Sequence, residues 1–301
     1  MSKGTSKIVL CFGEVLWDAL PQGLFLGGAP INVAYHLKLH GFSPVPVTAV
    51  GEDALGDEIL NRLHNWGLPT SGVVRLKGKP TGVARVELSP DGSPHFVIEP
   101  DAAWDWIELA PDVLKPAEEA AAIVYGTLSQ RGEYNRSCLA DLLSLASGAM
   151  KVLDVNLRPP YDSLDLAWSV AQKADMIKLN RDELNRMIPA KGRGQDPAIA
   201  AAELGSRAGC RLVCVTSGAE GAGLWSHGEW HRAPGRPVRV RDTVGAGDAF
   251  LAALVAAILE GKPNQEALEK ACRLGEFVAA SEGATPPYKL LLDGSIMPPA
   301  M

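Results

Sequence analysis

Short apolar runs alternate along the chain with longer segments of helical periodicity. Residues 8–12 read Ile-Val-Leu-Cys-Phe without a polar position, and residues 45–50 form a second, largely apolar run. Runs of this length are typical of strands buried on both faces of a parallel sheet. Similar runs occur at 122–125, 152–155, 176–179 and 212–216.

The segments between these runs predict helices. Residues 53–66 have an amphipathic pattern, with Asp53 placed to cap the N-terminus and Gly67 placed to end the helix. Further helices are expected at 133–147, 164–173 and 197–208. Repeated strand-then-helix segments favour an α/β fold, with a doubly wound, mostly parallel sheet flanked by helices. Since neither a repeat nor a linker interrupts residues 1–301, we expect a single domain.

Two stretches depart from this alternation. Residues 81–88 and 94–98 flank Ser-Pro-Asp-Gly-Ser at 89–93, which predicts a β-hairpin. Residues 14–26 are also strand-like and lead into Gly27-Gly28. We expect the insertions at about 14–28 and 80–106 to pair into a small β-sheet. Because two glycines absorb large backbone changes, that sheet would act as a hinged lid.

Composition excludes several classes of function. Apolar residues make up 47% of the chain and charged residues 21%, and the net charge of −6 comes without a lysine- or arginine-rich block, so nucleic acid is not expected as a partner. No apolar stretch approaches the roughly 18 residues of a membrane span. The first residues lack a signal peptide's apolar core, and the five cysteines are scattered. We therefore expect a cytoplasmic protein that acts on small molecules.

The most informative segment is 241–250, Arg-Asp-Thr-Val-Gly-Ala-Gly-Asp-Ala-Phe, which precedes an entirely apolar stretch at 251–259. That stretch predicts a helix buried on all sides, with Gly245, Ala246 and Gly247 at its N-terminus. Unpaired N–H groups and the positive end of the helix dipole meet there. The two glycines would let an anion approach the backbone closely.

Asp248 would lie in the first turn of this helix, beside the anion. The helix dipole favours an ionised carboxylate at that position. Such a carboxylate can orient an attacking hydroxyl and accept its proton, which suits phosphoryl transfer. The alternative is a tight turn with a capping aspartate. The preceding Asp242-Thr243 and the following buried helix favour the functional interpretation.

Three ordered motifs resemble those of the ribokinase-like (pfkB) carbohydrate kinases. They are Phe-Gly-Glu-Val-Leu-Trp-Asp at 12–18, Gly-Gly-Ala-Pro-Ile-Asn-Val-Ala at 27–34, and Asp-Thr-Val-Gly-Ala-Gly-Asp-Ala-Phe at 242–250. The resemblance runs from about residue 7 to about residue 287 and is strongest to fructokinases. It implies the ribokinase-like fold and transfer of the γ-phosphate of ATP·Mg²⁺ to a primary hydroxyl, with fructose as the leading acceptor.

The resemblance also implies roles for individual residues. Those that match the family's sugar ligands are Asp18, Gly28 and Asn32, and those that face substrate and phosphate are Asn156 and Arg158. The nucleotide would be lined by Asn180, Thr216, Ser217, Gly218 and Gly221. Glu183 would act indirectly on Mg²⁺. Asp242 and the carbonyl of Val244 match a monovalent-cation site, which holds an activating K⁺ in several members.

Other interpretations stay open from the residues alone. Asn180 and Glu183 could be a helix cap and its partner, and Asp154 and Arg158 a surface ion pair. The acceptor could be 2-keto-3-deoxygluconate, whose carboxylate would pair with Arg158 or Arg85, or the acceptor of another pfkB-type kinase. A non-catalytic sugar or nucleotide sensor is the rival of a different class. The exposed edge of the lid could also pair two subunits into a homodimer.

Overall fold

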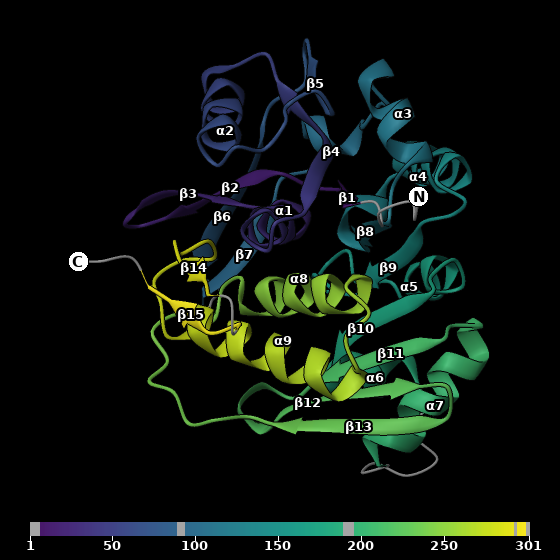
Figure 1. The fold of residues 1–301 in the computed structure, drawn as a ribbon. Coiled ribbons are helices and arrows are strands. Elements are labelled where there is room, and N and C mark those ends of the chain that lie inside the picture. Colours follow the sequence, from purple (N-terminus) through teal and green to yellow (C-terminus); the bar gives the residue numbers. More distant parts are fainter. Residues whose placement is uncertain (1–6, 89–93, 189–195, 292–293, 299–301) are drawn as a thin grey trace, which may run out of the picture.

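The computed structural model of the protein describes residues 7–88, 94–188, 196–291 and 294–298. Its largest sheet has nine strands in the order β13-β12-β11-β10-β9-β8-β1-β4-β5 (Figure 1). The strands from β11 to β5 run parallel, and β12 and β13 continue the sheet antiparallel. Their bounds are β1 Ile8–Phe12, β4 Ser43–Gly51, β5 Val73–Leu76, β8 Ala122–Gly126, β9 Met150–Asp154, β10 Met176–Asn180, β11 Leu212–Thr216, β12 Gly221–Ser226 and β13 Glu229–Pro234. The expected doubly wound, mostly parallel sheet is confirmed.

Helices cover both faces of the sheet, as the continuous apolar strands require. In β1, Val9 and Cys11 join the core on one face, and Leu10 and Phe12 join the core on the other. The first face carries α1 Ala29–Leu39, α2 Ala54–Asn65, α8 Ala246–Leu259 and α9 Asn264–Ala279. The second carries α3 Pro111–Glu118, α4 Glu133–Leu145, α5 Leu164–Ala171, α6 Arg181–Met187 and α7 Pro197–Ala208.

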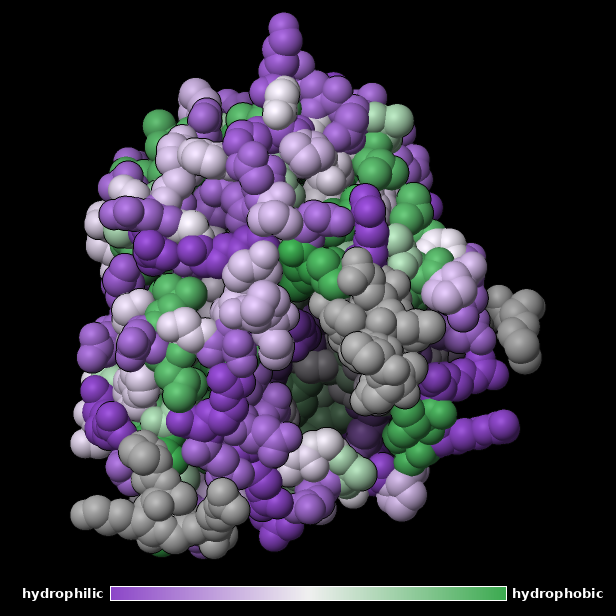
Figure 2. Space-filling model, turned by 180° about the vertical axis from the view of Figure 1, so that it is seen from behind, coloured by the Kyte–Doolittle hydropathy of each residue, from purple (hydrophilic) through white to green (hydrophobic). Residues whose placement is uncertain are grey.

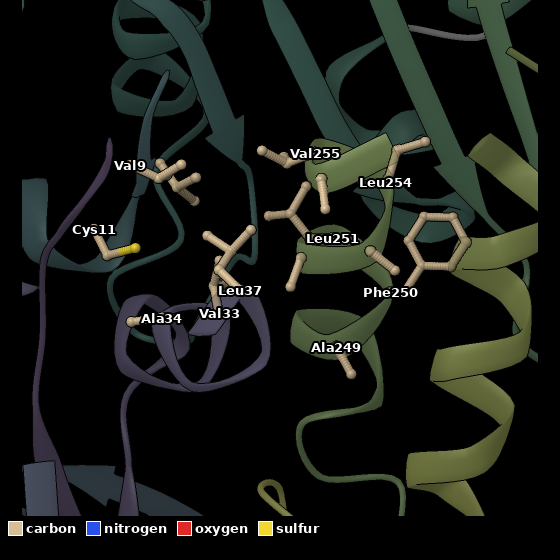
Figure 3. Packing of buried hydrophobic residues seen from close by; sticks show 14 of the residues in the cluster. Val9, Cys11, Val33, Ala34, Leu37, Ala249, Phe250, Leu251, Leu254 and Val255 are labelled. Carbon is tan, nitrogen blue, oxygen red and sulfur yellow. The ribbon is translucent and has the colours of Figure 1, made fainter. Parts of the chain in front are cut away.

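Helix α8 is buried along most of its length, as its composition predicts. Its residues from Asp248 to Ala257 are all buried. In Figure 3, Val33 and Leu37 of α1 lie across from Leu251 of α8, and Phe250 lies toward the neighbouring helix. Fully burying one such aliphatic side chain contributes about 1.5–3 kcal/mol. The packing therefore fixes α1 and α8 relative to each other.

A second, small sheet has the order β3-β2-β6-β7. Its strands are β2 Leu16–Leu20, β3 Gly23–Gly27, β6 Gly82–Leu88 and β7 Pro94–Ile98. The expected pairing of the two insertions is confirmed, and the strand-like stretch at 14–26 contains two antiparallel strands. The expected turn at 89–93 lies outside the described residues. Strand β3 leads through Gly28 directly into α1.

The small sheet rests on its own apolar cluster. Leu16, Ala84 and Ile98 face inward and pack with Trp104, which is completely buried. The cluster joins the small sheet to the short 3₁₀ helices η1 Ala103–Asp105 and η2 Leu128–Arg131. The small sheet is thus seated on the large one.

Local signals set the ends of several helices. The N–H of Gly56 donates to Asp53 Oδ1 at 2.8 Å, so Asp53 caps α2 as expected, and Gly67 follows the helix with a φ of 67°. Two expected helices end earlier than predicted, at Leu145 and Ala171. Near the C-terminus, β14 Lys289–Leu290 and β15 Ile296–Met297 form a short antiparallel pair. Among the described residues, no helix has both the length and the apolar character needed to cross a membrane.

Candidate active site

Three polar residues of the candidate site lie where neighbouring parallel strands end. Asp154 is the last residue of β9, and Asn180 and Thr216 end β10 and β11 and pair in register. Carboxyl ends of parallel strands meet at one edge of a sheet, which is where open α/β folds bind ligands. Figure 2 shows the face opposite to that of Figure 1, which is mostly hydrophilic and hollowed near its middle, with apolar residues inside the hollow.

Asp248 lies in the first turn of α8 and touches α1. Asn32 Nδ2 donates to Asp248 Oδ2 at 2.8 Å, which joins two motifs 216 residues apart in the sequence. Burial and the nearby charge of Asp154 raise the pKa of Asp248 to about 6, although Lys178 and Asn32 oppose the shift. The group is therefore ionised at pH 7 with a proton affinity well above that of an ordinary aspartate, as suits a general base.

The glycines before Asp248 each have a structural reason. Gly245 precedes α8 with a φ of 75°, and a Cβ there would lie 2.4 Å from Ala284 Cβ. A Cβ on Gly247 would lie 3.1 Å from Lys178 Nζ. The N–H groups of Gly247 and Asp248 belong to the first turn and have no intrahelical partner. Together with Ala246 they form the expected helix N-terminus, where an anion can bind.

Lys178 is a site residue that the sequence reasoning missed. Its Nζ lies 3.0 Å from both carboxylate oxygens of Asp154, and both side chains are buried. Burial opposes the charge, but Asp154 and Asp248 hold the pKa of Lys178 above its ordinary value. Asp154 thus holds the positively charged Nζ of Lys178 close to Gly247, at the N-terminus of α8. The available signal was a lysine inside an otherwise apolar strand.

On the other side of Asp248, the insertion at 14–28 and α1 bring several polar groups close together. Gly28 has a φ of 111°, and a Cβ there would lie 2.3 Å from the carbonyl oxygen of Glu14. A Cβ on Gly27 would lie 2.6 Å from Asp18 Oδ2. Burial raises the pKa of Asp18 to about 6. The structure thus places Asp18 beside the Gly27-Gly28 pair, and the carbonyl oxygen of Gly28 accepts from the N–H of Asn32 at 3.0 Å. Their role as sugar ligands stays a prediction.

Arg158 faces the same space from the loop after β9. Its positive charge lowers the pKa of Asp18, of Asp248 and of Glu14. Asn156, two residues earlier, has a φ of 39° and turns the chain between Asp154 and Arg158. The alternative of a surface ion pair between Asp154 and Arg158 is wrong, because Asp154 pairs with Lys178 instead.

Arg85 is less suited to binding the acceptor. Strand pairing sets Asp18 opposite Ala84 and sets Ala19 opposite Arg85. Since successive side chains alternate between the faces of a strand, Arg85 lies on the other face of the small sheet from Asp18. Its side chain is 63% exposed and lies 3.5 Å from Glu99.

The residues that are expected to line the nucleotide form the loops that follow β10 and β11. Thr216 ends β11, and Ser217 donates its N–H to the carbonyl oxygen of Gly221 at 2.8 Å, which closes a loop that begins its 3₁₀ turn at Gly218. Asn180 is exposed at the start of α6. The loops lie at the same sheet edge as Asp154, because β9, β10 and β11 are neighbours.

Glu183 has structural contacts at both carboxylate oxygens. They accept from the N–H groups of Asn180 and Leu157, each at 2.8 Å, while Asn180 Oδ1 accepts from the N–H of Glu183. This is a capping box that also ties the loop after β9 to α6. The helix-cap alternative is therefore realised, and the action of Glu183 on Mg²⁺ stays a prediction.

The segment expected to bind a monovalent cation is also held by main-chain contacts. The carboxylate of Asp242 accepts from the N–H of Val244 at 3.0 Å and of Gly283 at 3.3 Å. These contacts fix the loop that leads to Gly245. Across the part of the chain that the structure describes, no cluster of three or more His, Cys, Asp and Glu side chains could hold a metal ion. Magnesium in kinases is bound largely through phosphates and water, so such a cage is not required.

A helix N-terminus built for an anion, with a buried carboxylate beside it and a small sheet over the same edge, defines a phosphotransferase with a ribokinase-like fold. Residues 10–290 match the family model described as pfkB family carbohydrate kinase. The chain belongs to this family and is a carbohydrate kinase.

Relatives and solved structures agree with this membership. Fructokinase-1 of Oryza sativa subsp. japonica is 29% identical, over 94% of this chain and 95% of the relative. The structure of the Xylella fastidiosa fructokinase with bound ATP has a TM-score of 0.80 at 23% identity, covering 93% of this chain and 94% of that one. The 2-dehydro-3-deoxygluconokinase of Thermotoga maritima has a TM-score of 0.80 at 22% identity, covering 92% and 95%.

Proposed function

We propose that the protein transfers the γ-phosphate of ATP to a primary hydroxyl of fructose, giving fructose 6-phosphate. The hydrogen bond of 2.8 Å between Asn32 and Asp248 carries this proposal, because it joins the sugar motif to the phosphoryl-transfer motif. A complete arrangement of this kind argues against a non-catalytic sensor. The names of the relatives support fructose as the acceptor.

In this mechanism Asp248 orients the hydroxyl and accepts its proton as the oxygen attacks the phosphorus. The N-terminus of α8, with the N–H groups of Gly247 and Asp248 as donors, stabilises the charge on the moving phosphoryl group. Lys178 adds a positive charge beneath that N-terminus, held in place by Asp154. Arg158 is the exposed cation that would reach the phosphoryl group from the sugar side.

The cofactors follow from the same arrangement. ATP would lie along Asn180, Thr216 and the loop from Ser217 to Gly221, with its γ-phosphate at the N-terminus of α8. Mg²⁺ would neutralise phosphate charge during transfer, with Glu183 acting through the loop that it holds. A K⁺ ion bound by the segment containing Asp242 and the Val244 carbonyl would order the same N–H groups.

The charges of the pocket favour a neutral sugar over 2-keto-3-deoxygluconate. Asp18, Glu14 and Asp248 surround the acceptor side, and Arg158 is the single cation that acts on all three. A substrate carboxylate would meet several like charges, each of which disfavours binding. Hydroxyl groups can donate to the same oxygens. The fold does not separate the two acceptors, since a 2-dehydro-3-deoxygluconokinase shares it.

The small sheet would act as the lid over this pocket. Asp18 comes from β2, and its approach to the sugar requires the small sheet to lie over the sheet edge. Closure would exclude water and limit hydrolysis of ATP. The outer strand β3 exposes Leu24 and Phe25, 47% and 45% accessible, on an open sheet edge. We propose that this edge pairs two subunits into a homodimer.

A substrate panel tests the proposal. ADP release from ATP·Mg²⁺ is measured with fructose, 2-keto-3-deoxygluconate, ribose and adenosine, each with and without K⁺. We expect strong turnover with fructose and stimulation by K⁺. Turnover only with 2-keto-3-deoxygluconate would contradict the argument from pocket charge, and no turnover with any acceptor would contradict the proposed substrate class.

A further inference from the structure

Two buried oxygen atoms in the candidate site lack a hydrogen-bond donor within the described part of the chain. They are Glu14 Oε2 and Asn32 Oδ1, and both residues are only 4% exposed. The amide nitrogen of Asn32 already binds Asp248. Buried polar atoms in folded proteins are nearly always paired, because an unpaired acceptor loses its hydration without compensation. These two oxygens therefore require donors that the surrounding chain does not supply.

Glu14 stands at the junction of the elements that build the site. It follows β1 after Gly13 and precedes β2, and its Oε1 accepts from the N–H of Ala29 at 3.2 Å, in the first turn of α1. Gly28 lies against the carbonyl oxygen of Glu14, so the start of α1 wraps around this residue. Asn32, one turn further along α1, then reaches Asp248.

The anchoring of α1 does not by itself account for a carboxylate. A glutamine has the same length and could accept from the N–H of Ala29 with its carbonyl oxygen. A buried carboxylate is the more costly choice, because burial opposes its charge. In this site, burial and the charge of Asp248 raise the pKa of Glu14 to about 7, although the backbone N–H groups of Glu14 and Ala29 and the charge of Arg158 oppose that shift. When the group is ionised, its second oxygen is an acceptor that the amide nitrogen of a glutamine could not supply.

We propose that Glu14 positions the acceptor sugar, with Oε2 receiving one of its hydroxyl groups while Oε1 holds the start of α1. The same contact orients the sugar against Asn32 and Asp248. This inference rests on the proposed function, since it assigns Glu14 to the sugar side of that site. It also explains the preference for neutral polyols, because an acceptor oxygen selects donor groups and repels a carboxylate.

The test compares the wild-type protein with Glu14→Gln on fructose and on 1-deoxy-, 3-deoxy- and 4-deoxyfructose. The substitution keeps an acceptor for Ala29 and turns the other position into a donor. Losing a hydrogen bond to a charged group lowers affinity about 10- to 100-fold. We expect KM for fructose to rise by that factor, with KM for ATP unchanged. For the one analogue that lacks the contacted hydroxyl, both proteins should have equal kcat/KM.

Controls separate this role from a structural one. Glu119→Gln, on the exposed end of α3, should leave the kinetics unchanged. If Glu14→Gln loses its cooperative melting transition, Glu14→Asp replaces it, because the shorter carboxylate cannot reach both Ala29 and the sugar. An equal loss on fructose and on every deoxy analogue would overturn the proposal. If the wild-type protein phosphorylates none of these sugars, the proposed function fails instead.

Discussion

Replacing Asp248 by asparagine removes a negative charge while nearly preserving shape. The oxygen of the new carboxamide can still accept from Asn32 Nδ2, so the contact between α1 and α8 is retained. The side chain can no longer take the proton of the attacking hydroxyl. Loss of a positioned general base slows turnover about 100- to 10,000-fold. Fructose and ATP should bind almost as before.

The same substitution should stabilise the fold at high pH. Burial and Asp154 move the pKa of Asp248 from an ordinary 3.8 to about 6. At about 1.4 kcal/mol for each tenfold change in proton affinity, the ionised carboxylate costs the folded state about 3 kcal/mol. Because the folded pKa is raised, this cost is fully present above about pH 6 and disappears as the pH falls toward 4. With an unfolding entropy of about 2.1 cal/mol/K per residue, the variant should melt about 5 °C higher at pH 8.

Two measurements check this reasoning together. Thermal melts of both proteins at pH 8, 6 and 4.5 should show an advantage for Asp248→Asn that shrinks as the pH falls. The kcat/KM of the wild-type protein should fall below about pH 6. Because Asp248, Glu14 and Asp18 lie close together, this acidic fall in the pH profile reports their coupled protonation rather than that of one group. Retention of more than a tenth of the turnover would refute the assignment of the base. A lower melting temperature at pH 8 would refute the argument from burial.

Two further substitutions test the supports of the site. Lys178→Met leaves Asp154 buried without its partner and should lower the free energy of unfolding by about 3–5 kcal/mol; chemical denaturation measures this, and the double variant Lys178→Met/Asp154→Asn should recover most of the loss. Gly245→Ala places a methyl group 2.4 Å from Ala284 Cβ, whereas Gly261→Ala, at a similar positive φ, meets no atom within 4 Å. Both substitutions should lower the free energy of unfolding by about 1 kcal/mol, because alanine is disfavoured in the left-handed region. Only Gly245→Ala should also lose ATP turnover. Equal activity in the two variants would contradict the close packing at Gly245.

The alternation of apolar runs and helical patterns predicted six of the seven parallel strands of the main sheet, all except β5, together with helices α2, α4, α5, α7 and α8. Those signals are local, since a continuous apolar strand must be buried whatever surrounds it. The small sheet was harder to predict, because the turn between β2 and β3 rests on Pro21-Gln22 and the whole stretch has strand-like composition. A local pattern does not give the strand order; the pairing of the two insertions was expected because both interrupt the strand-then-helix alternation.

The sequence motifs predicted the location of the candidate site, but they did not predict which charged side chains are buried in it. Residues 245–248 identify a helix N-terminus with a carboxylate, and the family resemblance places Asn32 among the sugar ligands. The hydrogen bond between Asn32 and Asp248 was not predicted. Lys178 and Glu14 were missed because their importance depends on what lies across the fold: Asp154 on the neighbouring strand for the lysine, and Ala29 for the glutamate. A single charged residue within or beside an apolar strand was the one available hint.

The direct passage from β3 through Gly28 into α1 has a consequence for protein engineering. The outer strand of the small sheet and the helix that carries Asn32 form one continuous piece of backbone, without a loop between them. A lid transplanted from a relative to change the accepted sugar would therefore also shift helix α1. The position of Asn32 relative to Asp248 would then change. An exchange should take residues 16–39 as one block, together with the strands at 82–98, so that the transferred helix keeps its native seat against the lid. Grafts that cut at Gly28 should give folded but slow enzymes.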